Sequence, residues 1–410
     1  MKKLLVISFT FPPIEGIGGR RWAKFSKYLL RENIDVQILT AKLPSTIPSE
    51  WTDDINRLQI ENRIHFFDTH YPEVLVKPPQ SILDKLLYRL ALYRVKSKIK
   101  GSFYDKSALC KGPFLAAVTS FIEKGFKNII LSVGPFYFAS FLPELKKKFP
   151  NINIILDVRD PWTNNKTSFG YSTLHKERFE VEKIAEKKVA LGYDFIVSVA
   201  DDIGQYFINE YKISPDKVLT VKNGFDTEDI PPAIHLGNSK KHIVFTGNLY
   251  EKANPSFQMF YHQLRDLKSQ RPDLFRDFEF HFYGEIHPSM QHYFTEDLNL
   301  FFHQKISLKS VYEKISNASA CLLFLTDDLN YSFSTKFYEY LSLKKPILVF
   351  SKPGKTGLFV EENGIGRQMD GNNLSEVIES LDDNKFYRQS IDISAYDVEN
   401  LTKQYLTLIH

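Results

Sequence analysis

Short runs of apolar residues alternate with segments of helical periodicity along the chain. The runs expected to form strands in the first half lie at residues 4–10, 35–41, 128–134, 153–160, 194–200 and 217–224. A second series lies at 242–248, 278–284, 298–304, 320–327 and 346–352. Between the first two runs, Trp22, Phe25 and Leu29 share one face of a predicted helix. Almost fully apolar strands that alternate with helices indicate an α/β fold with parallel sheets covered on both faces.

The two series of strands are separated by a polar segment, residues 225–241. This segment contains Pro231-Pro232 and Gly237 and shows no periodicity. We therefore expect two doubly wound, Rossmann-like domains, with the first ending at residue 230 and the second starting at 231. Because ligands of such folds bind outside the carboxyl ends of the strands, a cleft between the domains is the expected site.

Composition narrows the class of protein further. The 410 residues carry a net charge of +4, which gives no reason to expect a nucleic-acid partner. Cys110 and Cys321 are the only cysteines and lie far apart, which favours neither a disulfide framework nor a zinc site and fits a reducing cytoplasm. The opening residues MKKLLVISF are shorter than a signal peptide requires and run into Pro12-Pro13, so we interpret them as a first buried strand. No apolar stretch is long enough to span a membrane.

A glycine-rich loop, GIGG at 16–19, follows the first predicted strand and is followed by Arg20 and Arg21. Such a loop is either a tight strand-to-helix turn or an anion site in which backbone N–H groups approach a phosphate. A dinucleotide-binding fingerprint requires a glycine where Arg21 stands and an acid after the second strand, so an oxidoreductase is not indicated. The segment PGKTG at 353–357 is not a P-loop, because Val349 occupies the position of its first glycine.

A second candidate anion site lies in FSTKFYEYLSLKKPILVF, residues 333–350. Ser334 and Thr335 are good caps for a helix that carries Lys336 and Glu339 on one side. The arrangement fits an ordinary capped helix with a surface ion pair. It also fits a nucleoside diphosphate, whose phosphates would meet the helix N-terminus and Lys336 while the ribose hydroxyls donate to Glu339.

The segment LDKLLYRLALYRVKSKIK, residues 83–100, predicts a helix with two apolar stripes. The stripe expected to face the core consists of Leu83, Leu86, Leu87 and Leu90. The second stripe consists of Tyr88, Leu92, Val95 and Ile99, and the cations beside it are Lys85, Arg89, Lys96 and Lys100. Apolar residues flanked by cations suit an anionic membrane surface, and a helix packed on both faces is the alternative.

Four stretches together resemble the family 4 retaining glycosyltransferases of the GT-B fold. They are FTFPPIEGIGGRRWAKFSKYL, IILDVRDPW, VKNGFD and STKFYEYLSLKKPIL, and DVRDPW is similar to the bacterial cell-surface polysaccharide branch. The resemblance covers almost the whole chain. It implies an acceptor domain at 1–230, a nucleotide-sugar domain at 231–394 and a helix at 395–410 that crosses back to the first domain.

The resemblance also assigns expected roles to single residues. Glu339 matches the second glutamate of the family's E-x7-E motif, which binds the nucleotide ribose, while the first glutamate is replaced by Tyr331. In GNLYEK, Asn248 replaces the family's arginine, and Lys252 keeps the role of its lysine with a spacing that differs by one residue. The remaining matches are Gly18 and Gly19 in the loop that faces the donor diphosphate, and Asp160 in the acceptor pocket.

The resemblance implies transfer of a sugar from a nucleotide donor, UDP being the expected nucleotide, to a hydroxyl of a lipid-linked glycan. Lys252, Lys336, the Gly18-Gly19 backbone and the helix start at Ser334 are expected to stabilise the leaving diphosphate, with Asp160 on the acceptor side. No cofactor and no metal are expected, because the sequence has no Asp-x-Asp and no HExxH. The expected location is cytoplasmic, peripheral at the inner face of the membrane. Two alternatives remain: an epimerase or hydrolase of nucleotide sugars with the same fold, and a non-catalytic nucleotide-sugar-binding subunit.

Overall fold

The structure is a computed structural model of the 410-residue chain. It describes residues 1–13, 17–43, 56, 60–76, 79–98, 106–107, 109–165, 176–232, 240–326, 332–371, 373–382, 385–387 and 391–410. The chain divides into two compact units, which are described separately. The first unit comprises Met1–Lys222 and Leu401–His410, and the second comprises Asn223–Asn400.

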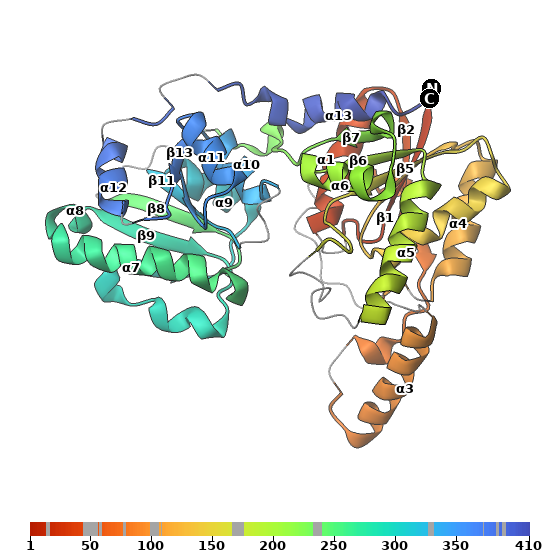
Figure 1. The fold of residues 1–410 in the computed structure, drawn as a ribbon, viewed down its shortest axis with the longest axis horizontal. Helices are drawn as coiled ribbons and strands as arrows, with labels where there is room; N and C mark the ends of the chain where they lie inside the picture. Colours follow the sequence, from red (N-terminus) through yellow and green to blue (C-terminus); the bar gives the residue numbers. More distant parts are fainter. Residues whose placement is uncertain are drawn as a thin grey trace. The chain divides into compact units, whose positions relative to one another are not determined.

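The first unit is built on a seven-stranded parallel sheet of order β3-β2-β1-β4-β5-β6-β7 (Figure 1). Its strands are β1 (Lys3–Ser8), β2 (Asp35–Lys42), β3 (Ile64–Asp68), β4 (Asn128–Ser132), β5 (Asn153–Val158), β6 (Phe195–Ser198) and β7 (Val218–Thr220). Its helices are α1 (Ile17–Arg31), α3 (Ile82–Lys98), α4 (Lys111–Glu123), α5 (Lys176–Gly192) and α6 (Asp201–Tyr211), with most of α13 (Val398–Leu406). The predicted face of α1 is buried, because Trp22, Phe25 and Leu29 are at most 1% exposed.

The second unit contains a six-stranded parallel sheet of order β10-β9-β8-β11-β12-β13. Its strands are β8 (Lys241–Thr246), β9 (Phe278–Tyr283), β10 (Leu300–His303), β11 (Ala320–Phe324), β12 (Ile347–Phe350) and β13 (Gly366–Gln368). Its helices are α7 (Asn254–Gln270), α8 (Pro272–Arg276), α9 (Leu308–Ser316), α10 (Thr335–Ser342), α11 (Lys355–Glu362) and α12 (Leu374–Asp382).

Two apolar cores lie on opposite faces of the second sheet. On one face, Ile243 and Phe245 of β8 pack with Phe257 and Phe260 of α7. On the other face, Val244 packs with residues of α10, including Phe337 and Tyr340. Side chains alternate between the faces along each strand, so the even-numbered residues of β8 share the α10 face.

The predicted α/β class and all eleven predicted strands are confirmed, within a residue or two at most ends. The prediction did not include β3 and β13, which are the outer strands of their sheets and pair on one side only. The first unit ends at Lys222 rather than at residue 230. The reason is that Phe225 packs in the second core and pairs by a β-bridge with Asp397.

The end of the described chain returns to the first unit, as the predicted crossing helix requires. The transition lies within α13, between Asn400 and Leu401. Lys2 Nζ donates to the carbonyl of Ile409 at 2.7 Å, and the two termini lie side by side in Figure 1. The predicted second boundary is at residue 394, and the second unit ends at Asn400.

Candidate functional site

The carboxyl end of β8 in the second unit passes directly into Gly247, whose φ is +132°. The neighbouring strand β9 ends in the same way at Gly284, with φ +144°. A Cβ on Gly284 would collide with the carbonyl group of Gly247, and a Cβ on Gly247 would collide with the side chain of Lys336. Both positions therefore require glycine, because side chains fit neither the space nor the backbone conformation.

Helix α10 begins beside this glycine pair. Ser334 is its N-cap, and the Ser334 Oγ accepts a hydrogen bond from the Phe337 N–H at 3.3 Å. The helix is fixed to β8 because the Tyr340 hydroxyl accepts from the Thr246 N–H at 3.1 Å. The N–H groups of the first turn have no partner inside the helix and carry the positive end of its dipole. Backbone N–H groups, Gly247 and Lys336 thus converge at one end of the sheet.

Lys336 is a cation held at this point without an acidic hydrogen-bond partner in the described part of the chain. Its Nζ lies 5.5 Å from the ring centre of Phe245, over the ring face. Burial lowers the pKa of Lys336, and the charge of Glu339 only partly opposes this effect. Lys336 is half-buried, and an ammonium whose charge is disfavoured by partial burial gains stability when an anion binds beside it. Glu339 itself is 8% exposed and lies one turn further along α10.

Asn248, which replaces the arginine expected from the resemblance, joins two loops. Its Oδ1 accepts from the Glu285 N–H at 3.2 Å, and its Nδ2 donates to Glu285 Oε2 at 3.5 Å. The loops after β8 and β9 are also paired through Leu249 and Ile286. Lys252 lies in the 3-10 turn Glu251–Ala253 that follows and is exposed. The structure therefore places Asn248, Lys336, Ser334, Thr335 and Glu339 at the same end of the sheet, and it places Lys252 in the connection from β8 to α7.

The predicted glycine loop of the first unit lies only partly within the described residues, since 14–16 fall outside them. Gly18 is in the first turn of α1. A Cβ on Gly19 would lie 2.8 Å from the Phe11 Cα, so Gly19 is required by the close approach of α1 to the preceding chain. Arg20 is half-buried, and the neighbouring Arg21 is buried. Local packing of α1 against the preceding chain therefore explains why residue 19 is a glycine.

Asp157, at the end of β5, is the centre of a buried polar network that the sequence did not single out. Asp157 is fully buried, and its Oδ1 accepts from the Tyr405 hydroxyl at 2.8 Å and from Arg21 at 3.4 Å. Its Oδ2 accepts from Trp22 Nε1 at 2.8 Å and from Ser132 Oγ at 3.1 Å. Tyr405 belongs to α13, so this network holds α13 on the first sheet.

Asp160 lies three residues further, in the loop after β5. This loop is anchored on α5, because Trp162 Nε1 donates to Glu182 Oε2 at 2.9 Å and the Thr163 hydroxyl donates to Glu186. Arg159 donates to the Val133 carbonyl at 2.9 Å. Within the described residues the Asp160 carboxylate accepts no hydrogen bond. Burial raises the pKa of Asp160, while the charge of Arg159 opposes the rise. The site is thus a half-buried carboxylate able to accept a hydroxyl proton.

The predicted helical segment is confirmed as α3, but the face predicted to be buried is exposed and the other face is buried. Tyr88, Leu92 and Val95 pack against Tyr71 and Leu75. The stripe predicted to face the core is instead exposed: Leu83, Leu86, Leu87 and Leu90 are 73%, 56%, 55% and 59% accessible, as are Ile82 at 86% and Tyr93 at 75%. The physical reason is that α3 projects from the first unit and, among the described residues, packs on one side only (Figure 1).

The predicted cations Lys85, Arg89 and Lys96 are exposed on α3, and so are Arg94 and Lys98. Ile99, Lys100 and Tyr331 lie outside the described residues. No described helix is both long enough and apolar enough to cross a bilayer. Cys110 and Cys321 are buried free thiols.

Comparison with known proteins identifies the fold. No protein-family model and no curated protein matches the chain. Among solved structures, a variant of S. aureus TarM in complex with fondaparinux, α-GlcNAc-glycerol and UDP matches with a TM-score of 0.57 and 14% identity, over 100% of this chain and 99% of that one. A glycosyltransferase from Rickettsia africae matches with a TM-score of 0.55 and 13% identity, over 100% and 94%. The UDP-GlcNAc 2-epimerase of Methanocaldococcus jannaschii matches with a TM-score of 0.57 and 10% identity, over 99% of both chains.

These likenesses show a GT-B fold, the fold of two Rossmann-like units predicted from the sequence. Glycosyltransferases and UDP-GlcNAc epimerases share this fold. At identities of 10–14%, the family and its chemistry do not follow from the likeness alone.

Proposed function

We propose that the protein is a retaining glycosyltransferase that moves a sugar from a UDP-sugar to a hydroxyl of a lipid-linked glycan in the synthesis of a bacterial surface polysaccharide. The observation that carries this proposal is the convergence of Gly247, Gly284, the first turn of α10 and the half-buried Lys336. Backbone N–H groups beside an unneutralised cation suit a diphosphate. A nucleotide-sugar partner is further supported by the bound UDP of TarM.

The chemistry follows from where charge develops. As the bond between the sugar carbon and the diphosphate oxygen breaks, its electron pair stays on the diphosphate, and the acceptor oxygen forms the new bond to the sugar. Lys336 and the N-terminus of α10 stabilise the departing charge, because they are held in place before the reaction. Lys252 adds an exposed cation in the connection that follows β8. In the first unit, Asp160 receives or orients the acceptor hydroxyl proton.

Incubation with radiolabelled UDP-sugars and a lipid-linked oligosaccharide tests the proposal. Transfer gives UDP and a longer acceptor, and anomeric analysis of the product shows whether configuration is retained. The likeness to a UDP-GlcNAc 2-epimerase makes an epimerase the second candidate function. An epimerase would isomerise the nucleotide sugar without any acceptor. A non-catalytic binding subunit gives neither product, although it still binds UDP.

Glu339→Ala is expected to weaken UDP binding by about 1.5–3 kcal/mol, because the ribose hydroxyls lose a charged hydrogen-bond acceptor. Isothermal titration calorimetry measures the change. The matched control is Glu362→Ala in α11, an exposed glutamate of the same unit that should leave affinity unchanged. Equal UDP affinity in Glu339→Ala and wild type would remove Glu339 from the ribose site.

Transfer is expected to continue at its full initial rate in EDTA, because Lys336 and backbone dipoles serve in place of a cation on the diphosphate. The measurement is the initial rate with and without chelator at saturating donor. An EDTA-sensitive rate that Mg²⁺ or Mn²⁺ restores would contradict this expectation.

Helix α3 is proposed to hold the protein at an anionic membrane surface, where lipid-linked acceptors are found. Its six exposed apolar side chains can enter the headgroup region, while the exposed lysines and arginines of α3 meet lipid phosphates. Each cation near such a surface contributes about 1 kcal/mol. The exposed stripe of α3 contains Leu83, Leu86, Leu87 and Leu90, so apolar leucine side chains are available to contact lipid, which supports this proposal.

Changing Lys85, Arg89 and Lys96 together to Gln is expected to weaken binding to vesicles containing anionic lipid about 100-fold. Changing Leu86, Leu87 and Leu90 to Ser should abolish it. Leu358→Ser, which changes a leucine of α11 with a similar 56% exposure, should have no effect. Co-sedimentation with vesicles measures each case, and wild-type protein that stays in the supernatant would contradict the proposal.

A further inference from the structure

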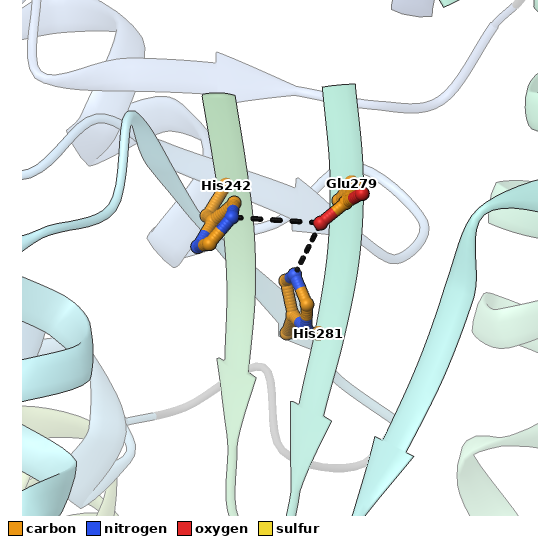
Figure 2. Close-up of side chains that lie close together, drawn as sticks. All are labelled: His242, Glu279 and His281. Atoms are coloured by element: carbon orange, nitrogen blue, oxygen red, sulfur yellow. Dashed lines mark hydrogen bonds and ion pairs between the residues drawn. The ribbon is translucent and has the colours of Figure 1, made fainter. Parts of the chain in front are cut away.

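Three metal-ligand side chains meet on the α10 face of the second sheet. His242 lies in β8, and Glu279 and His281 lie two residues apart in the adjacent strand β9. The register pairs His242 with Glu279, so all three side chains lie on one face. Figure 2 shows one oxygen of the Glu279 carboxylate in contact with both imidazole rings. Among the described residues, this is the one group of at least three histidine, cysteine or acidic side chains close enough to hold an ion.

The distances between the ligand atoms fit one metal ion. Glu279 Oε2 lies 3.5 Å from His242 Nε2 and 3.2 Å from His281 Nε2, and one ligand atom from each of the three residues lies within 4.8 Å of the other two. Zinc–nitrogen and zinc–oxygen bonds of about 2.0–2.1 Å in a tetrahedron separate neighbouring ligand atoms by about 3.3 Å. We propose that His242 Nε2, Glu279 Oε2 and His281 Nε2 bind a zinc ion whose remaining position is filled by water.

The groups around the cluster orient its ligands as a zinc site requires. His281 Nδ1 lies 2.9 Å from His303 Nε2, so His281 can donate from Nδ1 while its Nε2 lone pair faces the metal. Lys240 Nζ binds Glu279 through the other oxygen, Oε1, at 3.1 Å. That contact leaves Oε2 directed at the histidines. His303 and Lys240 are therefore positioning residues for the proposed site.

The proposed zinc site is separate from the proposed donor site in the same unit. His242 precedes Gly247 by five residues and His281 precedes Gly284 by three, which are distances of about 16 Å and about 10 Å along the two strands at about 3.3 Å per residue. The ion would cross-link β8 and β9 rather than contact the diphosphate. Its binding can therefore be tested without any assumption about glycosyl transfer.

The test uses full-length protein without a histidine tag, stripped with EDTA and freed of the chelator. Titration calorimetry with Zn²⁺ should give one equivalent bound, and Co²⁺ should give the intense visible absorption of a four-coordinate site. His242→Asn and His281→Gln should each weaken Zn²⁺ binding at least ~10-fold. His303→Ala should weaken it about 10–100-fold with unchanged stoichiometry, as expected for the loss of an orienting partner. The control His262→Ala changes an exposed histidine of α7 and should bind as wild type.

Thermal unfolding distinguishes a variant that has lost Zn²⁺ binding from a variant that does not fold. Zn²⁺ should raise the Tm of wild type and of His262→Ala but not that of His242→Asn, whose circular dichroism without metal should match wild type. The proposal is overturned if wild type binds no stoichiometric Zn²⁺, in which case the cluster is only a hydrogen-bonded network. Wild-type affinity in both His242→Asn and His281→Gln would overturn it equally.

Discussion

Lys336→Met is expected to lower turnover about 10²–10³-fold, the usual effect of removing one fixed group that stabilises developing negative charge. Lys336 lies against Gly247, and its pKa is lowered by burial, so its positive charge is disfavoured until an anion binds. The departing diphosphate carries more charge in the transition state than in the bound donor. The loss should therefore appear in kcat rather than in the donor KM.

The control for this variant is Lys268→Met, which removes an exposed lysine of α7 paired with Asp297 in the same unit. Steady-state kinetics with varied donor concentration should give the wild-type kcat and donor KM for Lys268→Met. If Lys336→Met retains normal kcat and shows only a raised KM, Lys336 serves ground-state binding and the proposed role is wrong.

The pH dependence gives an independent test of Lys336. Because its pKa lies below the ordinary value of lysine, the free enzyme loses this charge at lower pH than an exposed lysine would. The profile of kcat/KM should accordingly fall on its alkaline side as pH rises through the lowered pKa. That fall should be missing from the residual activity of Lys336→Met.

Asp157→Ala is expected to destabilise the first unit by about 3–5 kcal/mol, because it leaves Arg21 buried without its carboxylate. The change also removes the acceptor for Trp22, Ser132 and Tyr405. A loss of this size corresponds to a fall in Tm of about 6–20 °C for a unit of roughly 200 residues. Urea unfolding followed by tryptophan fluorescence measures the shift of the midpoint.

The partially exposed pair of Lys183 and Glu210 provides the control for Asp157. Glu210→Gln should cost at most about 1 kcal/mol, as expected for a surface ion pair. An unfolding midpoint for Asp157→Ala that lies within the range of Glu210→Gln would show that the buried network contributes little.

Most strands were predictable because a parallel strand that is covered by helices on both faces of its sheet consists almost entirely of apolar residues. Strand β13, Gly366–Gln368, contains Arg367 and Gln368 and therefore has no apolar run. An outer strand of this composition is recognised only from its pairing in the sheet. The stripes of α3 show a different limit. Helical spacing identified two apolar faces, but only the positions of Tyr71 and Leu75 decide which face is covered.

The candidate site was predictable where it lies within one element and hidden where it is assembled from several. Ser334, Lys336 and Glu339 could be grouped because they belong to one capped helix. Gly284 could not be assigned to them, since its contact with Gly247 depends on the pairing of β8 with β9. For the proposed zinc ligands, alternation of Glu279 and His281 on a strand was the available signal, but His242 joins them only through sheet register.

The return of Leu401–His410 to the first unit has a consequence for the order of folding. These residues are synthesised after all of the second unit, yet they supply Tyr405 to the network around Asp157 and Arg21. The second unit holds its own cores and can fold as it leaves the ribosome, whereas the first, although synthesised earlier, completes its packing later. Until then the nascent first unit exposes the surface of Trp22 and Phe25 that the Tyr405 ring covers in the folded protein.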